Sequence, residues 1–225
     1  MIRLVNVRKE YARGVALEDI SFRLAKGEFC FLTGHSGAGK STIMKLIHMA
    51  DWPTAGEVRV ASFSSATIRP REISMLRRKI GFVFQDYRLL QDRTASANVA
   101  FALEVTGARP AVIRTKVGRL LARVGLASKS EALPSEMSGG EQQRVAVARA
   151  LAHDPLVLLA DEPTGNLDER ATQGIFDLFR DINAAGTAVL LATHNLDLVR
   201  RNPGLRVIEL ARGSIVFDSA ANGGG

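Results

Sequence analysis

Near the start of the chain, hydrophobic and polar residues alternate with the period of β-strands. Residues 2–7 alternate, and Ile20, Phe22 and Leu24 are spaced two apart, so each segment has one apolar face. A turn at Lys26 and Gly27 separates this part from short apolar runs. These runs predict further strands at 29–33, 57–61 and 80–84.

The hydrophobic period becomes helical in the middle of the chain, from about residue 88 to residue 152. Pro110 suits the first turn of a helix, and the apolar stripe that follows ends at Gly125. The stripe consists of Ile113, Val117, Leu120, Leu121 and Val124. We therefore predict a helical insertion in a strand-rich chain.

Strand-like runs return at 156–160 and 187–193, and a helix that stops before Gly186 lies between them. The apolar face of this helix is formed by Ile175, Leu178, Phe179 and Ile182. Strands that alternate with helices predict an α/β fold with a parallel sheet. The runs at 205–210 and 214–217 predict a terminal hairpin, and the glycine-rich end is expected to be a flexible tail.

Length and composition favour one folded domain. The chain has 225 residues, of which 46% are hydrophobic and 24% charged, ordinary values for a globular protein. Its apolar runs are far shorter than the ~18 residues of a membrane span, and its first residues lack the order of a secretory signal. We expect a cytosolic protein. The single cysteine, Cys30, lies in an apolar run and is expected to be buried.

The charge balance is basic. The chain has 30 Lys and Arg and 23 Asp and Glu, which gives a net charge of +7. This charge favours an acidic partner such as nucleotide phosphates, nucleic acid or an anionic membrane. The basic residues occur in pairs and triplets without interleaved aromatics, so a solvated basic face is the default interpretation and no nucleic-acid partner is expected.

A glycine-rich loop connects the predicted strand at 29–33 to a helical pattern at 41–50. Its residues match the phosphate-loop pattern: Gly34, His35, Ser36, Gly37, Ala38, Gly39, Lys40 and Ser41. Glycines let backbone N–H groups converge on phosphate oxygens, and the helix N-terminus adds positive potential. Lys40 is placed for the β and γ phosphates and the Ser41 hydroxyl for Mg²⁺, so the loop predicts binding of a nucleoside triphosphate.

Two acids, Asp161 and Glu162, close the apolar run at 156–160. An open parallel sheet binds its ligand beside the carboxyl ends of its strands. Asp161 is therefore expected to hold Mg²⁺, directly or through water, and Glu162 to take a proton from the attacking water. Alone, such a pair could simply cap the next loop. Beside the phosphate loop it indicates hydrolysis.

A second anion site is predicted where Ser138, Gly139, Gly140 and Glu141 begin a helix. The N-terminus of a helix attracts anions because its first N–H groups have no partner within the helix. A plain N-cap at Ser138 is the alternative explanation.

The order of these segments resembles that of ABC-type ATPases along the whole chain. The shared features are the phosphate loop, Gln85 at a strand end, the Ser-Gly-Gly-Glu-Gln segment, the Asp-Glu pair, the loop Gly165-Asn166-Leu167-Asp168, and His194 after a further strand. Met137 stands where the family usually has Leu, an exchange of similar volume. The resemblance implies a RecA-like core with an antiparallel β subdomain over about 1–87 and 153–218, a helical subdomain over 88–152 and a tail at 219–225.

The resemblance also implies roles for single residues. Tyr11 corresponds to the aromatic that stacks on adenine, Thr42 extends the phosphate loop, and Gln85 corresponds to the sensor between Mg²⁺ and a membrane partner. His194 corresponds to the γ-phosphate switch, and Asp168 lies in the loop that communicates across a dimer. Residues 138–141 are implied to bind the ATP held by a second copy of the chain.

Within the family, the stretches 34–42, 84–90 and 193–201 are similar to those of the bacterial cell-division branch. That similarity implies a homodimer that acts on a transmembrane protein and lies on the inner face of the bacterial inner membrane. The lipoprotein-release and macrolide-export branches share the Gly-Asn-Leu-Asp loop and are the alternative.

The stretch after Gln85 is a candidate contact surface for the membrane partner. It contains Tyr87, Arg88, Leu89 and Leu90, and one aromatic, one Arg and two Leu are the composition of an interface anchor. Alternatively, the two leucines pack inside the helical insertion and the other two residues are ordinary surface.

Two further functional classes remain open from the sequence. A DNA-repair type ATPase is favoured only by the basic charge. Such proteins usually separate their nucleotide-binding halves by long coiled coils or zinc modules, whereas here one short helical insertion lies between the phosphate loop and Asp161. A nucleotide-gated scaffold would bind ATP without turnover, but it has no use for the general base that Glu162 provides.

Overall fold

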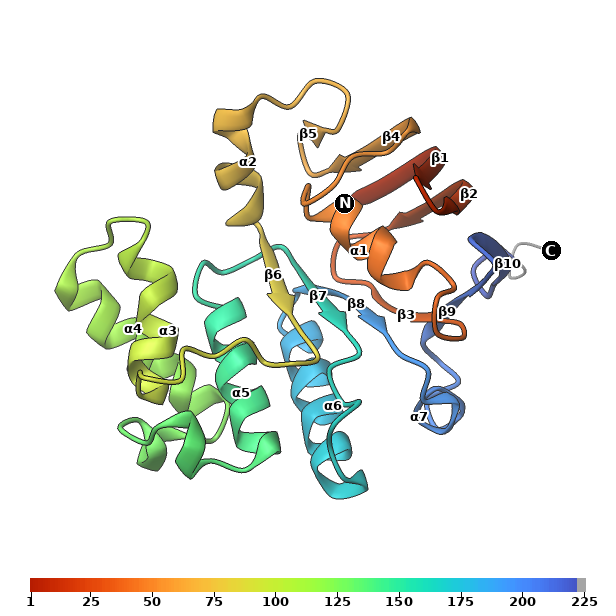
Figure 1. Cartoon of the computed structure of the whole chain (residues 1–225). Helices are drawn as coiled ribbons and strands as arrows, with labels where there is room; N and C mark the ends of the chain where they lie inside the picture. The colour runs from red at the N-terminus through yellow and green to blue at the C-terminus, as the bar shows by residue number, and fades with distance from the viewer. Residues whose placement is uncertain (222–225) are drawn as a thin grey trace.

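The computed structural model describes residues 1–221, in which the strands form two sheets (Figure 1). The first is antiparallel, in the order β2-β1-β4-β5, and joins β1 (Ile2–Tyr11), β2 (Gly14–Leu24), β4 (Ala55–Val60) and β5 (Phe63–Ser64). The second, in the order β10-β9-β3-β8-β7-β6, joins β3 (Phe29–Thr33), β6 (Ile80–Val83), β7 (Val157–Asp161), β8 (Ala188–Ala192), β9 (Arg206–Ala211) and β10 (Ser214–Asp218). Only its β9–β10 pair is antiparallel within these residues, which confirms the predicted parallel core and terminal hairpin.

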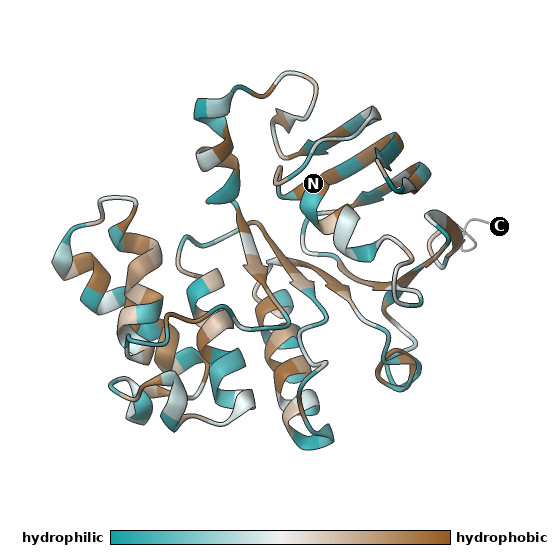
Figure 2. Ribbon diagram, in the orientation of Figure 1, coloured by the Kyte–Doolittle hydropathy of each residue, from teal (hydrophilic) through white to brown (hydrophobic). Residues whose placement is uncertain are grey.

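The central strands divide their side chains between two hydrophobic cores. In β3, Phe29 and Phe31 face one core, and Cys30 and Leu32 face the other, as the period of a strand requires. Figure 2 accordingly shows the central strands as hydrophobic along nearly their whole length. The sheet is therefore buried on both faces, as parallel sheets usually are.

Helices cover both faces of the six-stranded sheet. The helix α1 (Lys40–Ile47) packs between it and the antiparallel sheet, in the core that contains Leu32, Ile43 and Val58. The opposite core contains α5 (Gly139–Ala150) and α6 (Glu169–Ala184), whose Phe176 stacks on Phe31 with ring centroids 5.9 Å apart. The phosphate loop connects β3 to α1, and both elements bury side chains in the core between the two sheets.

The predicted helical insertion is formed by α3 (Ala95–Glu104), α4 (Pro110–Arg123) and α5, with two short 3₁₀ turns at Ala127–Lys129 and Pro134–Glu136. It lies to one side of the parallel sheet in Figure 1. The apolar stripe of α4 packs into the same core as α5 through Val117, Leu120 and Leu121.

Two helices were not predicted from the hydrophobic pattern. The first, α2 (Pro70–Arg77), buries Leu76 and keeps its other residues at least partly exposed, so it has no apolar stripe. Its start is instead fixed by Glu72, whose carboxylate accepts a hydrogen bond from the backbone N–H of Arg69 at 2.8 Å. The second, α7 (Leu196–Arg200), is too short to show a period and is capped by Asn195.

The end of the chain departs in part from the expected flexible tail over 219–225. The backbone N–H of Ser219 donates to the carbonyl of Val207 at 3.0 Å, and that of Ala221 donates to the carbonyl of Asp218 at 3.1 Å. The first residues of this segment are therefore held against β9 and β10, and 222–225 lie outside the described residues. Across residues 1–221, none of the helices combines the length and apolar character of a membrane span.

Candidate nucleotide-binding site

The loop between β3 and α1 is folded around the ammonium of Lys40. Its Nζ donates to the carbonyls of Gly34 at 2.7 Å and of His35 at 3.2 Å. Gly34 has a φ of 138°, and a Cβ there would lie 2.3 Å from the carbonyl oxygen of Leu210, so only glycine fits. The structure thus folds residues 34–40 into a compact loop at the start of α1, where the phosphate-loop pattern predicts nucleotide binding.

The turn of the C-terminal hairpin closes one side of this loop. The N–H of Gly213 donates to the carbonyl of Ala38 at 3.2 Å, and the carbonyl of Gly213 accepts from the N–H of Glu18 at 2.8 Å. One turn therefore connects the phosphate loop to β2, a contact that the sequence pattern does not indicate.

Lys40 and the predicted general base are in direct contact. The ammonium of Lys40 lies 3.3 Å from Glu162 Oε1, and both side chains are largely buried, with 7% and 15% of their surface exposed. The other oxygen, Oε2, accepts hydrogen bonds from His194 Nδ1 at 2.8 Å and from the backbone N–H of His194 at 3.2 Å. Residues distant in the sequence thus converge on one carboxylate.

The predicted metal ligands also meet. Ser41 Oγ donates to Asp161 Oδ1 at 3.1 Å, across 120 residues of sequence. Burial raises the pKa of Asp161, and the neighbouring Glu162 raises it further, while the Ser41 hydroxyl lowers it. A hydroxyl and a carboxylate are oxygen ligands of the type that hard divalent cations prefer, so this pair fits Mg²⁺.

A groove of about 640 Å³ collects most of the predicted phosphate-end residues. It is lined by Ala16, His35, Ser36, Gly37, Gly39, Lys40, Ser41, Thr42, Gln85, Glu162 and His194. Gln85, predicted as a sensor, therefore lies at the same groove as Ser41 and Glu162.

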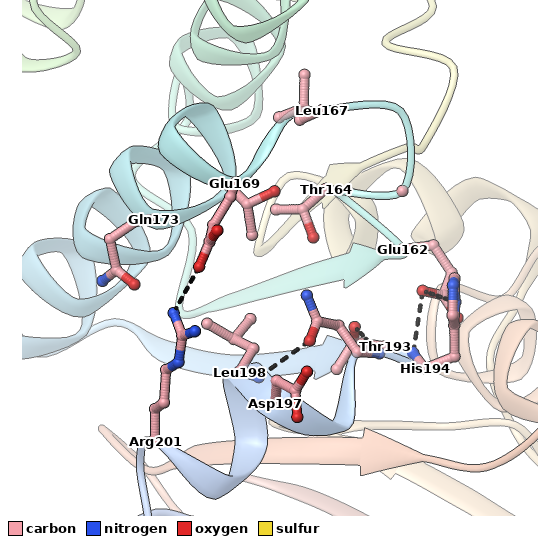
Figure 3. A pocket seen from close by; sticks show the side chains of 13 residues that line it. Glu162, Thr164, Leu167, Glu169, Gln173, Thr193, His194, Asp197, Leu198 and Arg201 are labelled. Carbon is pink, nitrogen blue, oxygen red and sulfur yellow. Dashed lines mark hydrogen bonds and ion pairs between the residues drawn. The ribbon is translucent and has the colours of Figure 1, made fainter.

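A second cavity, of about 530 Å³, meets this groove at Glu162 and His194, which line both. Figure 3 shows it between the start of α6 and the short helix α7, with Glu162 and His194 at one end. At the other end, Arg201 pairs with Glu169 at 3.0 Å. The hydrogen-bonded Glu162–His194 pair therefore forms a wall shared by the two cavities.

Tyr11 lies at the end of β1 and is 40% exposed. Its hydroxyl donates to Asp51 Oδ2 at 2.7 Å, while Lys9 Nζ lies 4.7 Å from the ring centroid and 2.6 Å from Asp51 Oδ1. Burial raises the pKa of Tyr11, Asp51 raises it further, and the nearby Thr42 of the groove lowers it. Asp51 and Lys9 thus fix the ring of the predicted adenine-stacking residue, and neither belongs to a recognisable motif.

The predicted second anion site lies apart from the groove. Ser138 caps α5: its Oγ accepts from the N–H of Glu141 at 3.3 Å, and Glu141 Oε2 accepts from the N–H of Ser138 at 2.9 Å. Lys129 pairs with Glu141 at 2.6 Å. Ser138, Gly139, Gly140 and Glu141 are not among the residues that line the groove, so within this chain the structure does not bring them to the phosphate loop.

The loop after the acidic pair packs between the Gln85 loop and α5. A Cβ on Gly165 would lie 2.8 Å from Gln85 Nε2, and one on Gly139 would lie 3.3 Å from a methyl of Leu167. Asp168 ends this loop as the N-cap of α6, accepting from the N–H of Ala171 at 2.7 Å.

The segment after Gln85 differs from the expected exposed anchor. Leu89 is 7% exposed and belongs to the hydrophobic core, so its inclusion in the contact surface was wrong. Tyr87 and Leu90 are half-buried, and Arg88 is exposed with its guanidinium 3.9 Å from the ring centroid of Phe84. The apolar spacing of leucines alone could not show which side of an irregular segment faces the core.

Arg149 holds the backbone of this segment. From α5 its guanidinium donates to the carbonyls of Tyr87 at 2.8 Å and of Arg88 at 2.6 Å. Both acceptor residues have a left-handed φ, 56° and 50°, which is uncommon for side chains of this size. Arg149 therefore fixes a strained turn between the groove and the helical insertion.

Comparison with known proteins adds to this geometry. The family model described as "ABC transporter" matches residues 17–165. The chain is 52% identical to the cell division ATP-binding protein FtsE of Mycobacterium tuberculosis over 97% of this chain and 95% of that protein. It is 46% identical to FtsE of Escherichia coli over 96% and 97% of the two chains. A solved dimeric ATP-binding cassette in a post-hydrolysis state, bound to ADP and Pi, superposes with a TM-score of 0.86 at 34% identity, over 97% of this chain and 98% of the other.

Proposed function

We propose that this chain, which belongs to the ABC transporter family and is an ATPase of the ABC type, is the ATP-hydrolysing subunit of a bacterial cell-division complex. The observation that carries the proposed chemistry is the contact between Lys40 and Glu162 at the end of the phosphate loop. The similarity to FtsE proteins of two distant bacteria supports the cell-division branch over lipoprotein release or macrolide export.

The residues of the groove have complementary roles in the proposed hydrolysis. The ammonium of Lys40 binds the terminal phosphates of ATP and thereby leaves Glu162, its present partner. The freed carboxylate accepts a proton from the attacking water, while His194, hydrogen-bonded to Glu162 Oε2, keeps the carboxylate directed at the γ-phosphate end of the groove. A placed base of this kind supports turnover over a scaffold that only binds ATP.

We assign Ser41 and Asp161 as ligands of Mg²⁺, with Gln85 lining the same groove as Ser41. A bound Mg²⁺ would supply positive charge near the terminal phosphates of ATP. Binding would use the charged form of Asp161. Burial raises the pKa of Asp161, and a nearby cation would favour its charged form.

The separation of Ser138 from the groove supports a dimer as the active form. In our proposal, the N-terminus of α5 from one copy covers the ATP held by the phosphate loop of the other, and Tyr11 stacks on the adenine from its own chain. A two-fold arrangement satisfies both sites at once. Asp168, at the start of α6, lies in the loop that meets the second copy.

The membrane partner is proposed to be a transmembrane protein of the FtsX type, contacted through Tyr87, Arg88 and the exposed part of Leu90. Arg149 supports this assignment because it ties the backbone of the segment to α5, so motion of the helical subdomain reaches the contact surface. The protein then lies on the inner face of the bacterial inner membrane, held there by its partner.

The test is the Glu162→Gln variant with ATP and Mg²⁺. The amide keeps the size of the side chain but is not a base, so we expect ATP binding without hydrolysis and accumulation of a dimer on size-exclusion chromatography. The same variant with Lys40→Ala is the matched control and should stay monomeric. A Glu162→Gln protein that binds ATP and remains monomeric would contradict the proposed composite site.

A further inference from the structure

Gln143 is a buried side chain of α5 for which the proposed chemistry gives no role. It has no exposed surface, and its Nε2 donates to the carbonyl of Pro163 at 2.7 Å. A carbonyl can only accept, so the nitrogen of the amide must face Pro163. Gln143 Oε1 is buried and has no hydrogen-bond partner among residues 1–221. A buried amide with one unmet acceptor is costly, which indicates a function for the bond that it does make.

The carbonyl that Gln143 holds belongs to the residue directly after the proposed general base. Glu162 has a φ of 48°, a left-handed conformation, and its backbone N–H donates to the carbonyl of Ala192 at 3.0 Å. The Gly165 N–H then donates back to the Glu162 carbonyl at 3.1 Å, closing a tight turn. The hydrogen bond from Gln143 to the Pro163 carbonyl thus fastens this turn to α5, and the turn sets where the Glu162 carboxylate lies.

The helix that carries Gln143 begins at the proposed anion site. Ser138 caps α5, and Gln143 lies five positions later, within the first turn and a half of the same helix. A helix moves as a rigid unit over such a length, so a shift of its N-terminus shifts the Gln143 amide with it.

We propose that Gln143 is a positioning residue that fixes the main chain of Pro163, holds the Glu162 carboxylate in its working place and couples it to α5. The inference rests on the proposed function, because it assigns the consequence of the bond to hydrolysis. In the proposed dimer, α5 touches the ATP of the opposite copy, so the same bond connects the occupancy of one site to the base of the other.

The test uses Gln143→Met in the full chain. Methionine keeps the volume of the side chain and removes the donor, so packing is retained. We expect kcat to fall roughly tenfold and KM for ATP to change less than about twofold, because one hydrogen bond that places the base is lost while the nucleotide contacts remain. The matched control is Gln91→Met, which removes a part-buried amide hydrogen bond to the Leu89 carbonyl and should leave both constants unchanged.

Two outcomes separate this inference from the proposed function. Glu162→Gln with Gln143→Met should still dimerise with ATP and Mg²⁺, as Glu162→Gln alone should, because the α5 N-terminus is intact. Loss of dimer only in the double variant would show that Gln143 supports the anion site instead, and would overturn the inference. Failure of both proteins to dimerise would contradict the proposed composite site.

A second variant, Gln143→Glu, keeps the inference testable if Gln143→Met does not fold. A protonated Glu has nearly the shape of Gln and can donate its O–H to the Pro163 carbonyl, and burial raises the pKa of such a carboxyl. Relative to the wild-type protein at each pH, its kcat should rise as the pH is lowered from about 8 to about 6. The assignment would be overturned if Gln143→Met had the kcat of the wild-type protein. It would also be overturned if the ratio of the Gln143→Glu kcat to the wild-type kcat did not change with pH.

Discussion

The ammonium of Lys40 and the carboxylate of Glu162 are 3.3 Å apart. The cation expected to bind phosphate and the base expected to activate water therefore form one ion pair. An incoming phosphate competes with the carboxylate for Lys40, and the release of Glu162 is linked to nucleotide binding.

Replacing Lys40 tests the phosphate-loop assignment directly. Lys40→Ala removes the point charge that faces the phosphates, which backbone N–H groups cannot supply. We expect ATP affinity to fall roughly 10- to 100-fold, measured by isothermal titration calorimetry. Lys26→Ala, which removes the same charge from an exposed turn, is the control. Unchanged affinity in a folded Lys40→Ala protein would refute the role of this loop.

Asp161 is expected to govern the dependence on Mg²⁺. Asp161→Asn removes the charge but keeps the size, so the Mg²⁺ concentration for half-maximal ATPase activity should rise about tenfold or more. Burial raises the pKa of Asp161, so in the unmodified protein Mg²⁺ affinity should begin to fall with decreasing pH at a higher pH than for an ordinary carboxylate. Titration of Mg²⁺ at several pH values measures this. An unaltered Mg²⁺ requirement in Asp161→Asn would place the ion elsewhere.

His48 gives the stability of the fold a pH dependence. It packs edge-on against Phe82 with ring centroids 5.3 Å apart, and burial, with the nearby Arg77, lowers the pKa of His48 to about 4. In the unfolded chain His48 binds a proton below its ordinary pKa near 6.5, whereas in the folded protein it stays neutral down to about 4. Its contribution to the free energy of unfolding should therefore fall by about 3 kcal/mol as the pH drops from about 7 to about 4.

Urea unfolding of the wild-type protein and of His48→Phe at several pH values isolates this contribution. Phenylalanine keeps an aromatic ring against Phe82 and does not titrate, so its variant should lose less stability on acidification. Parallel loss in both proteins would show that other groups control the acid sensitivity.

The partner surface is tested by Tyr87→Ala combined with Arg88→Glu. These changes alter the exposed and half-buried side chains but leave the carbonyls that Arg149 binds. Capture of the FtsX-type subunit should weaken roughly thirtyfold in a pull-down or a binding titration, while ATP affinity stays nearly intact. Full capture by the variant would move the contact surface elsewhere, and loss of ATP binding would show that the segment is structural.

The sequence was most informative where short-range pattern and local chemistry agree. The strand at 29–33 and the loop after it were predicted correctly, because a buried strand, a glycine-rich turn and a helix start each leave their own signal. The helix α2 left no such signal in the hydrophobic pattern, because Leu76 is its only buried residue. Leu89 was misplaced because burial in an irregular segment depends on the neighbouring helices.

The residues that support the site could not be predicted for a different reason. Asp51 fixes Tyr11 from 40 positions away, and Arg149 holds the Tyr87 carbonyl from 62 positions away. Each contact joins a side chain to a hydroxyl or a main-chain carbonyl, so no spacing within the sequence marks it. The topology of the two sheets brings these groups together.

The hairpin turn at Gly213 also orders events during synthesis of the protein. The phosphate loop is translated early, but its Ala38 carbonyl and the backbone of β2 acquire their hydrogen bonds to Gly213 only when the turn between the last two strands has left the ribosome. A nascent chain that ends before this turn lacks one wall of its nucleotide cradle. The phosphate loop therefore completes its hydrogen bonds only after β9 and the turn that follows it have been synthesised, long after the loop itself.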